Sequence, residues 1–138
     1  MISLNTTKKT YLMLFACTAF LSGCSKGEVV EYHQVSGQIT YQDKPLVYGT
    51  VIFEPDAQAG NAGAQGFAEV ENGFYDTSRN GRGVLGGAYK IYISGQAEKG
   101  DPEKGVIPPQ LFRDFLVKID IPKGPSVQNF KVLPDAKK

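Results

Sequence analysis

Residues that commonly build catalytic centres and metal sites are scarce in this chain. It has one histidine, two cysteines and no tryptophan among its 138 residues. A zinc site needs several His or Cys ligands, and a Ser-His-Asp triad would have only His33 to use. No serine stands in the sequence context of a nucleophile elbow. We therefore expect no catalytic, metal-binding or cofactor-binding residues, and a protein that is not an enzyme.

Long apolar runs and an excess of one charge are missing as well. The longest apolar run covers residues 11–21, whereas a helix that crosses a bilayer needs about 20 such residues. The formal net charge of the chain is +1, and without residues 1–23, which hold two lysines, it is about −1. So small a net charge argues against nucleic acid, or an anionic membrane surface, as a charge-driven partner.

The start of the chain is built like a removed signal. A pair of lysines precedes the apolar run and small residues follow it, which is the pattern of a secretory signal peptide. The segment Leu21-Ser22-Gly23-Cys24 resembles the lipobox of bacterial lipoproteins. That resemblance implies cleavage before Cys24, acylation of this residue with chains such as palmitate, and anchoring to a membrane of the cell envelope, facing the periplasm or the cell surface. An ordinary secretory signal with a chance cysteine is the alternative.

These features divide the chain into four parts. Residues 1–23 form the signal, 24–32 the lipidated cysteine and a tether, 33–134 the folded domain and 135–138 a basic tail. Cys17 leaves with the signal and Cys24 carries lipid, so no disulfide remains. The domain must therefore be stabilised by a core of apolar side chains.

Beyond the tether, apolar residues recur with the period of 2 that is typical of strands. Turn residues separate these stretches, and Asn72-Gly73 is the strongest hairpin signal. We expect strands at residues 35–41, 50–54, 66–70, 75–78, 88–94, 115–121 and 127–133. Seven short strands in about 100 residues predict an all-β domain, a seven-stranded antiparallel β-sandwich.

The inward positions of these strands predict the core, and the longest connection predicts the contact surface. The core should contain Val35, Ile39, Val51, Phe53, Tyr75, Tyr89, Ile91, Ile93, Val117, Ile119, Phe130 and Val132. Residues 95–114 are rich in charge and proline, and we expect them to be mobile and to make contacts. Only four apolar side chains would pin this connection to the domain, namely Val106, Ile107, Leu111 and Phe112.

Several segments together resemble a known family. They are VSGQITY at 35–41, KPL at 44–46, GTVIFEP at 49–55, ENGFY at 71–75, GAYKI at 87–91, IPP at 107–109 and NFKV at 129–132. In this order they resemble the carboxypeptidase regulatory-like (transthyretin-like) domain of small planctomycete-type lipoproteins. Asn72 replaces the aspartate that is usual there, and a turn accepts both. The resemblance implies a prealbumin-like sandwich that acts as a rigid spacer or interaction unit, and it implies no activity.

A few side chains outside the core are weaker candidates for a site. Calcium would need denser acidic spacing than the chain offers, so solvated charge is the favoured interpretation of Asp101 and Glu103 in the long connection and of Glu69, Glu71 and Asp76 near the hairpin. Exposed aromatics can bind sugar or protein. For these we favour packing, with Phe112 under the long connection and Tyr92 paired across strands.

The sequence thus predicts a lipid-anchored cell-envelope protein whose non-catalytic β-sandwich is a structural or protein-interaction module. Its partners would be the membrane, through lipid on Cys24, and another envelope protein or a polysaccharide, but no nucleic acid. One alternative is a carbohydrate-binding module of the envelope. A less favoured alternative is a small hydrolase: the transthyretin-related hydrolases are similar, but they need several histidines and a terminal Tyr-Arg-Gly-Ser that this chain lacks.

Overall fold

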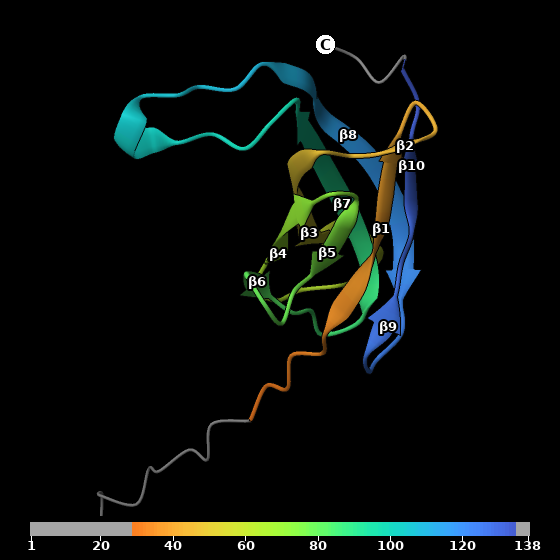
Figure 1. Cartoon of the computed structure of the whole chain (residues 1–138). Helices are drawn as coiled ribbons and strands as arrows, with labels where there is room; N and C mark the ends of the chain where they lie inside the picture. Colours follow the sequence, from red (N-terminus) through yellow and green to blue (C-terminus); the bar gives the residue numbers. More distant parts are fainter. Residues whose placement is uncertain (1–28, 135–138) are drawn as a thin grey trace, which may run out of the picture.

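Strands dominate the computed structural model, which describes residues 29–134 (Figure 1). Two 3₁₀ turns, η1 (Ala57–Ala59) and η2 (Pro102–Lys104), interrupt them. The strands are β1 (Val35–Tyr41), β2 (Lys44–Pro45), β3 (Tyr48–Pro55), β4 (Gly66–Glu71), β5 (Phe74–Asp76), β6 (Gly81–Arg82), β7 (Gly87–Gln96), β8 (Gln110–Ile121), β9 (Ser126–Val127) and β10 (Phe130–Val132). Within these residues, no helix is long and apolar enough to cross a membrane.

Hydrogen bonds join the strands into one curled sheet in the order β10-β1-β5-β4-β3-β7-β8. The short strands β2 and β9 pair with β1, and β6 pairs with β4. Most pairs are antiparallel, but β1 runs parallel to both β9 and β10. The predicted all-β, largely antiparallel class is therefore confirmed, with a parallel pairing that the sequence pattern did not predict.

The β4–β5 hairpin forms where the sequence predicted it. Asn72 and Gly73 both adopt positive φ, 51° and 82°. Two such residues in succession suit the tight turn whose twist matches that of the flanking strands. As a result Val70 faces Tyr75, and Glu71 faces Phe74.

Other strand boundaries differ from the prediction. Lys44 and Pro45, expected in a turn, fold back onto β1 as β2, because the positive-φ residues Gln42 and Asp43 complete the turn before them. Residues 79–83 lie between two expected strands and contain β6, which was not predicted. The expected last strand is broken into β9 and β10 around Gln128, whose carbonyl accepts a hydrogen bond from the Tyr75 hydroxyl at 2.7 Å. A Cβ atom at position 37 of β1 would collide with that same carbonyl, so Gly37 allows this segment to approach β1.

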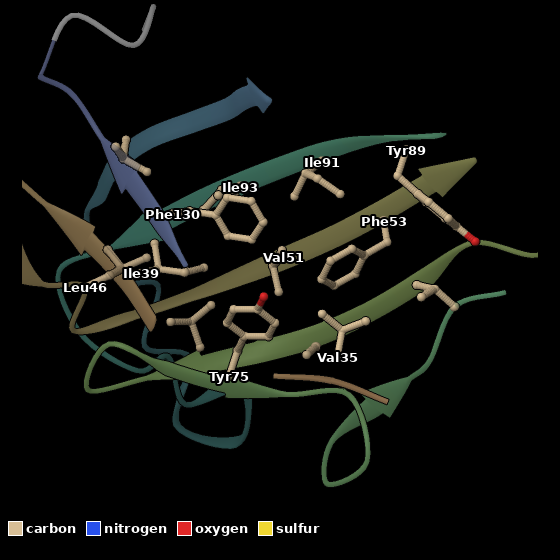
Figure 2. Packing of buried hydrophobic residues seen from close by; sticks show 14 of the residues in the cluster. Val35, Ile39, Leu46, Val51, Phe53, Tyr75, Tyr89, Ile91, Ile93 and Phe130 are labelled. Carbon is tan, nitrogen blue, oxygen red and sulfur yellow. The ribbon is translucent and has the colours of Figure 1, made fainter. Parts of the chain in front are cut away.

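One apolar cluster fills the inside of the curl, and Figure 2 shows its side chains pointing toward one another. Ten of the twelve predicted core residues are buried. The prediction was wrong for Val117 and Ile119, which are only partly buried because β8 is an edge strand of the sheet. The buried apolar residues outside the predicted core are Leu46, Ala68, Val70, Val84, Ile121 and Phe112, of which Phe112 was expected to pack under the long connection.

The connection between β7 and β8 projects from the sheet as an arm, residues 97–109 (Figure 1). It is shorter than the predicted 95–114, because both strands continue into it. Asp101 caps η2, and a bridge between Asp101 and Val106 closes the tip. Val106 and Ile107 are 43% and 91% exposed. The expectation that these two side chains pin the connection is therefore wrong, since the tip is held by its own backbone hydrogen bonds.

Candidate functional site

Of two residues that the sequence analysis singled out, the structure describes His33 but not Cys24. Cys24, the predicted lipidation site, lies outside the described residues. The backbone of His33 makes an isolated bridge with Val84, with N···O distances of 2.7 and 2.9 Å. In the part of the chain that the structure describes, no three His, Cys, Asp or Glu residues gather closely enough to hold a metal ion.

The acidic candidates are engaged in local contacts. Asp101 accepts from the Lys104 backbone and lies 2.8 Å from the Lys104 ammonium. Asp76 accepts from the backbone and the hydroxyl of Ser78, at 2.8 and 2.6 Å, and these hydrogen bonds lower the pKa of its carboxyl. Each carboxylate therefore stabilises the turn in which it lies.

The two aromatic candidates behave as expected. Phe112 is buried; its ring lies 4.9 Å from that of Tyr41 and against Gly95, where a Cβ atom would collide with it. Tyr92 lies on the outer face of β7, opposite Ile52 of β3 and Leu116 of β8. Phe112 therefore belongs to the core, and Tyr92 takes part in a row of cross-strand neighbours.

That row crosses four strands of the outer face and consists of Phe67, Ile52, Tyr92 and Leu116. We call it the apolar row. Its two ends are almost half exposed, 44% for Phe67 and 47% for Leu116. Three strand spacings of about 4.8 Å give it a length of about 14 Å. An apolar stripe that is partly exposed on an outer sheet face is a candidate interaction surface.

Polar and charged side chains border the apolar row on both sides. On one side lie Thr50 and Ser94, which are paired in register. On the other, Asp56 is 94% buried and binds the ammonium groups of Lys90 and Lys118 at 3.3 and 3.9 Å. Burial alone would raise the pKa of the Asp56 carboxyl, but Lys90, with help from the Gln58 N–H and Lys118, lowers it. The border is thus polar, and Asp56 holds Lys90 more closely than it holds the exposed Lys118.

A second feature of the outer face is a hollow of about 680 Å³. We call it the Phe74 hollow, because Phe74 of β5 is 61% exposed in it. Strands β1, β4 and β5 contribute side chains to it, as do the turn after β5 and the β9–β10 segment. In register, Phe74 stands between Gln38 of β1 and Glu71 of β4.

Glu71 links the Phe74 hollow to the arm. Its carboxylate binds the Lys99 ammonium at 2.6 Å, and this hydrogen bond raises the pKa of Lys99. The same ammonium lies 5.3 Å from the centre of the Tyr48 ring, within cation–π range. Burial, together with the negative charge of Glu69, raises the pKa of the Tyr48 hydroxyl.

Comparison with known proteins assigns no function to these surfaces. No model of a protein family matches the sequence. No curated protein and no solved structure matches the chain either.

Sequence reasoning missed the apolar row and the Phe74 hollow. Period-2 alternation already placed Tyr92 outward, and the same alternation would have placed Ile52, Phe67 and Phe74 outward. Their grouping depends on the register between strands, which local sequence does not contain.

Proposed function

We propose that this chain is a lipid-anchored protein of the bacterial cell envelope, with a non-catalytic β-domain that acts as a structural or protein-interaction module. Anchoring rests on the lipobox-like segment that ends at Cys24. The interaction role rests on one observation, the apolar row on the outer sheet face.

The chemistry of the row favours a protein partner from the envelope. Aromatic and aliphatic side chains with a polar border have the composition of the centre and rim of a protein interface. Asp56 pairs with Lys90, and only Lys118 is left as a loosely held cation of the border, which is too little charge to attract an anionic membrane surface. A partner that covers the row with an apolar strip of its own would bury Phe67 and Leu116 without separating these charges.

We also propose that the curled sheet is a transthyretin-like sandwich. The support is that β1 and β8, five positions apart in the strand order, meet across one core, where the rings of Tyr41 and Phe112 are in contact. The parallel pairing of β1 with β10 folds the C-terminal segment over that core. A solved structure in which the strands separated into unrelated layers would contradict this assignment.

Replacement of Cys24 tests the anchor. In the native host, Cys24→Ala should abolish labelling with a palmitate analogue and release the protein from the membrane fraction. The matched control is Cys17→Ala, which removes the other cysteine and should leave labelling intact. Equal labelling of the two variants would contradict the proposed anchor.

Site-specific crosslinking tests the docking surface. A photoreactive residue at Leu116 or Phe67 should give the same discrete adduct in intact envelopes, and Tyr92→Asp should remove it. The same probe at Leu133, which is 55% exposed and outside the row, is the control. An adduct with the mass of two copies of the chain would overturn the proposed partner, as would equal adducts at Leu133.

A further inference from the structure

We propose that the Phe74 hollow is a binding site for a neutral saccharide, with Phe74 as the stacking platform. This site is separate from the apolar row, because none of the four side chains of the row lines the hollow. The inference therefore does not depend on the proposed protein partner.

Phe74 offers the apolar half of the recognition. A pyranose ring has a face of C–H groups and an edge of hydroxyl groups, so it needs an apolar plane with polar groups around it. Phe74 is 61% exposed although it belongs to a paired strand. Its neighbours in register are both polar, Gln38 on one side and Glu71 on the other. An exposed ring within a polar border is the arrangement that a sugar ring can cover.

Carboxamides offer the polar half. Gln38, Asn72, Asn80 and Asn129 line the hollow, and each carboxamide can donate and accept. Sugar hydroxyls need both, since each hydroxyl is donor and acceptor at once. Asn129 is held in place because its Oδ1 accepts from the Gln38 backbone at 2.8 Å, which leaves its NH₂ group for a ligand.

One carboxylate is positioned in the same way. Asp76 uses Oδ1 for the backbone and hydroxyl of Ser78, and this leaves Oδ2 as a fixed acceptor. A side chain whose geometry is already fixed loses little conformational freedom when it binds a ligand. The hollow is therefore preorganised at two points of its polar border.

The charge of the hollow argues against an anionic ligand. Glu69, Glu71 and Asp76 line the hollow against a single cation, Arg79, so phosphates and uronic acids are disfavoured. A cationic ligand gains little from these carboxylates. Glu71 already holds Lys99, and Arg79 offsets one of the two that remain. The volume of about 680 Å³ falls in the range of small-molecule sites, about 300–1,000 Å³. The hollow is open on one side, so we expect a Kd of about 1 mM.

Ligand-observed NMR with the full chain in detergent micelles tests the inference. The probes are disaccharides of glucose, galactose, mannose and N-acetylglucosamine, with glucuronic acid and glucosamine as charged counterparts. At least one neutral disaccharide should show saturation transfer. Phe74→Ala should weaken that binding at least about ten-fold, which corresponds to ~1.4 kcal/mol. Phe67→Ala is the matched control, since it removes an exposed phenylalanine of the same sheet face outside the hollow.

Three results would overturn the inference. The first is that no neutral disaccharide binds. The second is that Phe67→Ala weakens binding as much as Phe74→Ala does, which would place the saccharide on the apolar row. The third is that only glucosamine binds, which would make the hollow a cation site. A variant Asp76→Asn keeps the shape of the side chain and an Oδ1 acceptor for Ser78 but replaces the free acceptor Oδ2, so its saccharide binding should fall.

Discussion

Two isoleucines on neighbouring strands provide a direct test of the register of the sheet. Ile91 of β7 is fully buried in the core, whereas Ile52 of β3 lies in the apolar row on the outer face. The test compares two single variants, Ile91→Ala and Ile52→Ala, each in an otherwise unchanged chain. The chemical change is the same, so any difference in the free energy of unfolding reports on burial alone.

The expected magnitude follows from the burial of Ile91. Ile→Ala removes three carbon groups, worth about 0.8 kcal/mol each when buried, and the cavity adds to this. Ile91→Ala should therefore cost about 2–5 kcal/mol. For a domain of roughly 100 residues, each kcal/mol lowers the melting temperature by about 4–8 °C. Thermal unfolding followed by circular dichroism should show a drop of at least about 8 °C for Ile91→Ala and of only a few degrees for Ile52→Ala.

The comparison also has an outcome that would refute the reasoning. A shift of the strand by one residue would exchange the inner and outer faces. In that case Ile52→Ala would be the more damaging change, and Ile91→Ala would barely move the melting temperature. Equal and large effects would mean that Ile52 is buried as completely as Ile91, in contradiction to its partial exposure on the outer face.

Two further experiments address a buried carboxylate and the arm. Because the pKa of Asp56 is lowered in the folded state, its contribution to stability is complete above the unfolded pKa of about 3.9 and is lost as the pH falls below it. The melting temperature of Asp56→Asn should depend less on pH in that acid range than that of the parent, and identical profiles would contradict the role of Lys90. Within residues 29–134, trypsin should cleave first after Lys104, whose side chain is 78% exposed at the tip of the arm. Lys99, held by Glu71, should be cut later and Lys90, 19% exposed in β7, last; early cleavage after Arg79 with Lys104 intact would place the most accessible backbone elsewhere.

Local sequence was sufficient to predict the structural features that depend only on residues close together in the chain. The bounds of β1 agree with the alternation from Val35 to Tyr41, and the positive-φ pair Asn72 and Gly73 defines the hairpin. Alternation also predicted which side chains of β3 and β7 face inward. These features follow from the pleat of a strand and from turn chemistry, both of which are written in a few consecutive residues.

Features that depend on distant partners could not be predicted in this way. Leu46 is buried because β2 folds back on β1. Since β2 has only two residues, alternation of apolar and polar side chains could not indicate it. The parallel pairing of β1 with β10 joins segments about ninety residues apart. The apolar row and the Phe74 hollow have the same origin, since each requires the registers of three or more strand pairs at once.

The position of β1 has a mechanical consequence. The chain enters β1 at Val35, and the strand ends at Tyr41, whose ring touches Phe112 near the base of the arm. A pull between the N-terminal end of β1 and the arm would therefore run along the strands (Figure 1). Ladder hydrogen bonds lie across that direction. Tension must then shear several bonds between β1 and its neighbours together, instead of peeling them off one at a time. Because forced unfolding depends on the rate of unfolding, this arrangement would let the curled sheet resist a load applied between the start of β1 and the arm.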